Sequence, residues 1–107
     1  MKTYSISITP DAEADLWAVR NYIADTLKAP DTALDYILAI RNEIAKLEYI
    51  ASTIAPVLDE PWHSRKIRRI PSKGFFVYYR IDEDNDIVYV MNIIYQKSDQ
   101  IKILQRY

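Results

Sequence analysis

The residues best suited to chemistry are basic and aromatic side chains gathered between positions 61 and 80, a stretch with six bases and no acid. Phe76, Tyr78 and Arg80 alternate along a predicted strand, so we expect all three on one face. Cations beside aromatic rings can stack nucleic-acid bases and hold phosphates, or meet an acidic protein. The predicted binding set is Arg65, Lys66, Arg68, Arg69, Lys73, Phe76, Tyr78 and Arg80.

Simpler interpretations of this stretch stay open, since six bases also suit a solvated face and outer aromatic residues can simply cover a small sheet.

The sequence has few residues for other kinds of catalytic or ligand-binding chemistry. His63 could act as a general base, but a lone histidine beside Trp62 is more often structural. Gly74 is the only glycine, which excludes a glycine-rich phosphate loop. Cysteine is absent, so we expect no thiol nucleophile and no cysteine-based metal site. With His63 as the single histidine we expect no metal, and we expect no cofactor.

Composition sets the class of protein. The 107 residues are half apolar, which suits a single domain, residues 1–107, with a real core. No apolar run is long enough to span a membrane and the first residues do not resemble a signal peptide, so we expect a cytoplasmic location. Residues 1–60 carry 5 bases and 10 acids, a net charge of −5, whereas residues 61–107 carry 9 bases and 5 acids, a net of +4.

The elements that would position these residues begin with a strand at 3–8, where polar and apolar side chains alternate. Thr9 can cap a helix whose first position suits Pro10, and apolar residues recur at helical spacing up to Leu27. Pro30 ends that segment and starts a second helix with a long apolar stripe. The two helices predict a helical hairpin with a short connection.

The second half turns to strands. We expect a short basic strand at 65–70, strong strands at 75–81 and 87–95, an acidic turn between these two, and a short helix or strand at 99–107. The order β-α-α-β-β-β predicts an α+β fold, with the N-terminal helical hairpin packed on one face of an antiparallel sheet. The core face of the strand at 75–81 would carry Phe75, Val77, Tyr79 and Ile81. The face bearing Phe76, Tyr78 and Arg80 would stay open.

Two motifs carry a family resemblance: Tyr79-Arg80-Ile81-Asp82 before the acidic turn, and the weaker Tyr95-Gln96-Lys97-Ser98-Asp99 after the last strand. With the N-terminal strand, Pro10 and the helical hairpin, the chain resembles the RelE/ParE toxin superfamily over nearly its whole length. The resemblance implies a growth-inhibiting toxin of a type II toxin–antitoxin system, bound and neutralised by a cognate antitoxin. Members divide into ribosome-dependent mRNA endoribonucleases similar to RelE and inhibitors of DNA gyrase similar to ParE.

Departures from the RelE pattern favour a toxin similar to ParE plasmid-stabilisation proteins, which are not nucleases. Phe76 stands where RelE-like nucleases have a phosphate-binding arginine, and the basic pair after the last strand is reduced to Lys97. A nuclease or an inactive toxin-fold binding protein remains the alternative, and oligomeric state is open beyond a heteromeric antitoxin complex. The candidate catalytic set combines Arg68, Arg69, Lys73 and Lys97 for charge with Tyr78, Tyr95 or His63 for proton transfer.

Overall fold

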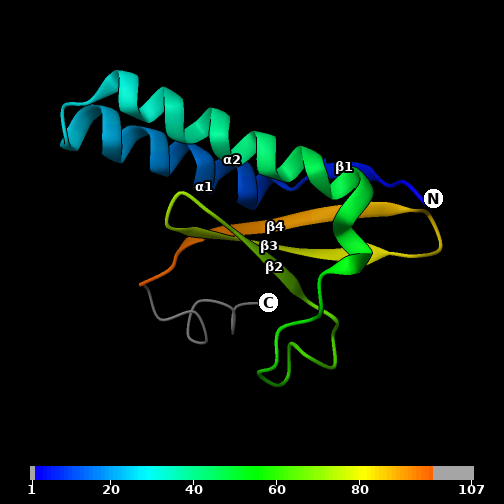
Figure 1. Ribbon diagram of the computed structural model, residues 1–107. Helices are drawn as coiled ribbons and strands as arrows, with labels where there is room; N and C mark the ends of the chain where they lie inside the picture. The colour runs from blue at the N-terminus through cyan, green and yellow to red at the C-terminus, as the bar shows by residue number, and fades with distance from the viewer. Residues whose placement is uncertain (1, 98–107) are drawn as a thin grey trace.

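The computed structural model describes residues 2–97 and has the predicted α+β architecture. Both long helices lie on one face of the sheet (Figure 1). The prediction for the tail at 99–107 lies outside the described residues. The elements in chain order are β1 (Ser5–Ile8), α1 (Pro10–Asn21), the π-helical turn η1 (Tyr22–Thr26), α2 (Pro30–Ile50), the 3-10 turn η2 (Ala51–Thr53), β2 (Arg68–Ser72), β3 (Phe75–Asp82) and β4 (Ile87–Tyr95).

The four strands form one sheet in the order β1-β4-β3-β2. Strands β2, β3 and β4 make the predicted antiparallel meander, and β4 is an inner strand as expected. The prediction of a fully antiparallel sheet is wrong, because β1 pairs with β4 in parallel, with Ser5 opposite Ile87 and Ile8 opposite Val90. The helical hairpin and the first two strands of the meander together form the long crossover that a parallel pair requires.

Local sequence signals fix the helix starts. The Thr9 hydroxyl accepts a hydrogen bond from the Ala12 backbone nitrogen at 3.3 Å and donates one to the Val90 carbonyl at 2.8 Å. Thr9 therefore caps α1 and ties the start of the helix to the middle of β4. Pro10 and Pro30 occupy the first positions of α1 and α2, as predicted, where a proline loses no helical hydrogen bond.

The main core lies between the helices and the sheet. Apolar side chains of α1 and α2 pack against one face of β2, β3 and β4, here called the helix face. Ile40 and Val77 are both fully buried in this cluster, which confirms the predicted layout. Phe75 and Ile81 pack against the cluster from its edges, so the predicted core side of β3 is also confirmed.

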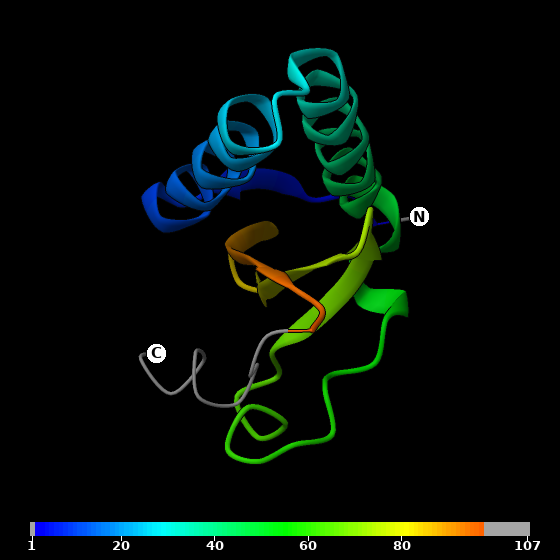
Figure 2. The same cartoon turned by 90° about the vertical axis from the view of Figure 1, so that its left-hand side faces the viewer.

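The opposite face of the sheet, here called the back face, is partly covered. The return segment, residues 54–67, leaves η2 and runs on the side of the sheet away from the helices (Figure 2). Its Trp62 and Ile67 bury Tyr78, which has no exposed surface. The prediction that Tyr78 lies on an open face is therefore wrong. The physical reason is that the return segment supplies apolar side chains of its own, which close over the phenol ring.

The basic strand is shifted from its predicted position. Strand β2 covers Arg68–Ser72, whereas we expected residues 65–70. Lys66 instead has a left-handed backbone, with φ of 59°, in the turn that precedes the strand.

Within residues 2–97, no helix is long and apolar enough to cross a membrane. The same residues hold no cluster of acidic and histidine side chains suited to a metal ion.

Candidate functional site

Arg68, the first residue of β2, has its side chain on the helix face. Its Nη1 donates to the Ala51 carbonyl oxygen at 3.3 Å, and the Tyr79 hydroxyl donates to the same oxygen at 2.7 Å. Ala51 directly follows α2, where the last carbonyls have no partner inside the helix and carry partial negative charge. Arg68 therefore caps the C-terminus of α2, and its guanidinium is engaged inside the fold.

Arg69 lies on the back face, because successive residues of a strand point to opposite sides. Its guanidinium carbon stands 3.9 Å from the centroid of the Phe76 ring. Its Nη1 also donates to the Tyr78 hydroxyl at 3.1 Å. The structure thus gathers Arg69, Phe76 and Tyr78 into one cluster and separates this cluster from Arg68 by the thickness of the sheet.

The environment of Tyr78 opposes proton transfer near neutral pH. Burial raises the pKa of the Tyr78 hydroxyl, and the hydrogen bond from Arg69 offsets only part of that increase. Burial also raises the pKa of Tyr79 to about 12. A catalytic acid or base works best with a pKa near the operating pH. Both phenols are therefore held in the protonated form, away from that optimum.

Most of the other candidate residues, whether for binding or for catalysis, are spread over the surface. Arg80 is exposed on the back face and stacks on the ring of Tyr89, with 4.5 Å between the guanidinium carbon and the ring centroid. Arg65 and Lys66 are exposed in the return segment, and Lys97 is exposed beyond the end of β4. His63 is exposed as well, and its Nδ1 lies 3.0 Å from the Val57 carbonyl oxygen. This contact joins two parts of the return segment and fits a structural histidine.

Two candidate residues meet in a cleft of about 810 Å³ between the closed end of the helical hairpin and the turn that joins β2 to β3. We call it the tip cleft. Lys73 and Tyr95 both line it, although they are 22 positions apart in the sequence. Its main lining side chains are Tyr22, Leu27, Tyr36, Lys73, Phe75 and Tyr95.

The turn at the mouth of the tip cleft has a defined geometry. Lys73 and Gly74 have φ values of 51° and 81°, as a two-residue hairpin loop with left-handed residues requires. This turn is where the chain uses its only glycine. The Lys73 Nζ lies 5.3 Å from the centroid of the Tyr36 ring, so a cation stands over an aromatic side chain of α2.

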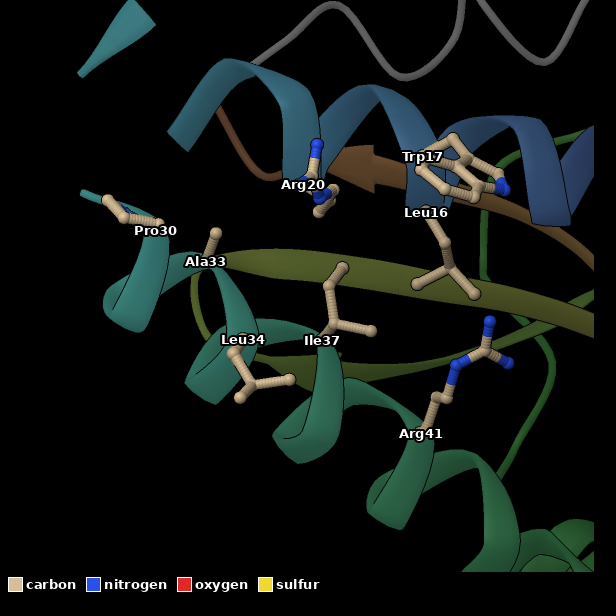
Figure 3. A pocket seen from close by; sticks show the side chains of 8 residues that line it. All are labelled: Leu16, Trp17, Arg20, Pro30, Ala33, Leu34, Ile37 and Arg41. Carbon is tan, nitrogen blue, oxygen red and sulfur yellow. The ribbon is translucent and has the colours of Figure 1, made fainter. Parts of the chain in front are cut away.

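A second hollow, the outer groove, runs between α1 and α2 on the side away from the sheet (Figure 3). It measures about 350 Å³. Trp17 and Leu34 form part of its rim and are 61% and 57% exposed. Arg41 stands at one end, where its guanidinium makes two hydrogen bonds with the Glu13 carboxylate at 3.3 and 3.1 Å. Exposed apolar side chains beside such a hollow make it a candidate contact surface for another protein.

The sequence reasoning missed most residues of these two hollows. Tyr22, Leu34 and Tyr36 are not among the residues that the sequence singles out for binding or catalysis. A signal for Leu34 exists, because Leu34 and Leu38 are four residues apart on α2 and lie beside the core stripe. Both are more than half exposed. A second apolar stripe on a helix is therefore the sequence signal that would have indicated a partner surface here.

Comparisons with known proteins agree with this fold. Residues 6–100 match the family described as "ParE toxin of type II toxin-antitoxin system, parDE". The match covers most of the chain, which therefore belongs to this family of toxins. None of the curated proteins matches the sequence significantly.

The solved structures that share the fold include two toxin–antitoxin systems. One is a chromosomal ParDE toxin–antitoxin system from P. aeruginosa, with 22% identity, a TM-score of 0.72, and coverage of 87% of this chain and 96% of that one. The other is the RelBE2 toxin–antitoxin complex from Mycobacterium tuberculosis, with 15% identity and a TM-score of 0.63. Its alignment covers 87% of this chain and 98% of that one. At these identities the likeness concerns architecture alone.

Proposed function

We propose that this chain is a cytoplasmic toxin that inhibits growth by binding DNA gyrase, that it does not cut RNA, and that a cognate antitoxin neutralises it. Membership of the ParE family supports the toxin role. The observation that carries the non-nuclease part is the separation of Arg68 from Arg69 on the two faces of the sheet.

The physical argument concerns charge at the transition state. Phosphodiester cleavage gathers negative charge on one phosphate, so the catalytic cations must converge on one point. Arg68 caps α2 instead, and Arg69 stacks on Phe76 on the far side of the sheet. Phe76 also takes the position at which RelE-like nucleases have an arginine. The back-face cations then serve protein binding, with exposed Arg80 available to a partner.

The structural neighbours support an antitoxin partner, since both belong to solved toxin–antitoxin assemblies. The exposed apolar surface of the helical hairpin needs such a cover. An acidic antitoxin segment would complement the basic stretch at 65–80. The exposure of Trp17, Leu34 and Leu38 supports adding the helices to that surface.

A ribosome-dependent mRNA endoribonuclease is the second candidate, because Lys73 and Tyr95 line the same cleft and could supply a cation and a phenol. Purified protein added to a gyrase supercoiling assay and to translating ribosomes separates the two functions. We expect blocked supercoiling and intact messenger. Messenger cleavage that is lost in Tyr95→Phe or Arg69→Ala would contradict the proposal. Binding of the antitoxin without either effect would indicate an inactive toxin-fold binding protein.

A further inference from the structure

We propose that the tip cleft is the anchor point of the antitoxin, and that it receives one large apolar side chain next to a carboxylate. This inference rests on the proposed function, because it takes the antitoxin as the occupant. It adds a location and a chemistry for the contact. The anchoring segment is acidic, and its carboxylate pairs with Lys73.

The size and lining of the cleft define the apolar part of the occupant. Its volume of about 810 Å³ lies in the range of sites that enclose a drug-sized group. Four aromatic side chains line it: Tyr22, Tyr36, Phe75 and Tyr95. Tyr22 and Tyr95 are 57% and 47% exposed, so much of this aromatic surface faces solvent. The cleft has room for a bulky apolar side chain together with the backbone that carries it, and such a buried anchor typically supplies much of the binding energy of an interface.

The charge of the cleft defines the rest of the occupant. Lys73 is the only charged residue among the described residues that line it. Its ammonium group lies over the face of Tyr36, 5.3 Å from the ring centroid. A carboxylate would form a stronger, charge-assisted hydrogen bond with the same ammonium group. None of the described residues that line the cleft is a carboxylate that could compete for Lys73, so an acidic segment complements the cleft.

The outer groove is less suited to bind a carboxylate. Arg41 is already held by the Glu13 carboxylate. Arg20 donates to the Asn21 side-chain oxygen at 2.8 Å and stands over the Trp17 ring. The groove also has less than half the volume of the tip cleft. We therefore assign the acidic anchor to the tip cleft, and the outer groove offers apolar contact alone.

The test uses the full chain and the product of the adjacent reading frame as the candidate antitoxin, with affinity measured by calorimetry at two salt concentrations. Tyr22→Ala removes an exposed cleft ring, and Tyr49→Ala is its control, because Tyr49 is 53% exposed on α2 outside the cleft lining. Lys73→Gln removes the cleft charge. Its control is Lys46→Gln, because Lys46 is an exposed lysine on α2 outside the cleft lining. We expect Tyr22→Ala and Lys73→Gln to weaken binding about 10-fold or more each. Both controls should bind like the wild type.

Salt provides a second measurement. Binding by Lys73→Gln should lose part of the salt dependence of the wild type, whereas Tyr22→Ala should retain it. Equal affinity of all four variants and the wild type would overturn the tip cleft as anchor and leave the toxin assignment intact. Failure of the wild-type chain to bind the neighbouring protein would overturn the antitoxin partnership itself, and this inference with it.

Discussion

The two faces of the sheet are built differently, and Arg68 and Arg69 show the difference at neighbouring positions. On the helix face, two long helices cover β2, β3 and β4 with a continuous apolar cluster, and Arg68 serves this face by capping α2. On the back face, the return segment covers only a smaller cluster around Trp62 and Tyr78. Arg69 and Arg80 lie at its margins, each stacked on an aromatic ring.

The comparison separates stability from function. A side chain enclosed by helices contributes mainly to the free energy of folding, so its charge is unavailable to a ligand. A side chain at the edge of a partial cover keeps one side in solvent and can bind a partner. Of two adjacent arginines, we therefore expect Arg68 to matter for stability and Arg69 for binding.

The largest expected effect tests the helix-face core. Ile40→Ala removes a fully buried side chain of α2 and should lower the free energy of unfolding by about 2–5 kcal/mol, because it leaves a cavity. Leu38→Ala, on the same helix but 52% exposed, should change it by about 0.5 kcal/mol or less. Urea denaturation of both variants checks this prediction, and equal losses would contradict the assignment of the core face.

The next effect concerns pH. The pKa of Tyr79 is raised to about 12 in the folded protein and is near 10 in the unfolded chain, so the unfolded state loses this proton first. The contribution of Tyr79 to the free energy of unfolding is therefore fully present below pH 10 and is lost as the pH rises towards 12. Relative to Tyr79→Phe, the wild type should lose about 3 kcal/mol over this interval. The measurement is the free energy of unfolding of both proteins from pH 9 to 12. If it changed with pH in the same way in both, the predicted role of Tyr79 would be wrong.

The smallest effect compares the two arginines directly. Arg68→Ala should lower the free energy of unfolding by about 1–2 kcal/mol, since it removes a charged donor at the end of α2. Arg69→Ala loses a surface stacking contact worth about 0.5–1 kcal/mol. In a gyrase supercoiling assay the order should reverse, with Arg69→Ala losing more inhibition than Arg68→Ala. If the two variants lost the same free energy of unfolding and the same inhibition of gyrase, the proposed division between a stabilising face and a binding face would be wrong.

Much of the fold followed from local signals that act within one element. The Thr9–Pro10 pair marks the start of α1 because a side-chain cap and a proline both act on the first helical turn. The acidic turn between β3 and β4 and the inner position of β4 followed from turn chemistry and from apolar residues on both faces. The family resemblance depended on the order of these same elements, and residues 6–100 match the ParE family.

What the sequence could not provide is the arrangement of segments that meet only through the tertiary fold. Alternation along β3 correctly placed Tyr78 opposite the core face, but only the packing of Trp62 and Ile67 decided that this face is covered there. The parallel pairing of β1 with β4 likewise depends on the path of the whole chain.

The candidate site shows the same division. The sequence determined that Arg68 and Arg69 point in opposite directions, because side chains alternate along a strand with a fixed period. Only the tertiary structure decided which direction meets the end of α2 and which meets Phe76. It also decided that Lys73 and Tyr95 line one cleft with Tyr22 and Tyr36, since long-range contacts between helix and strand leave no periodic trace in the sequence.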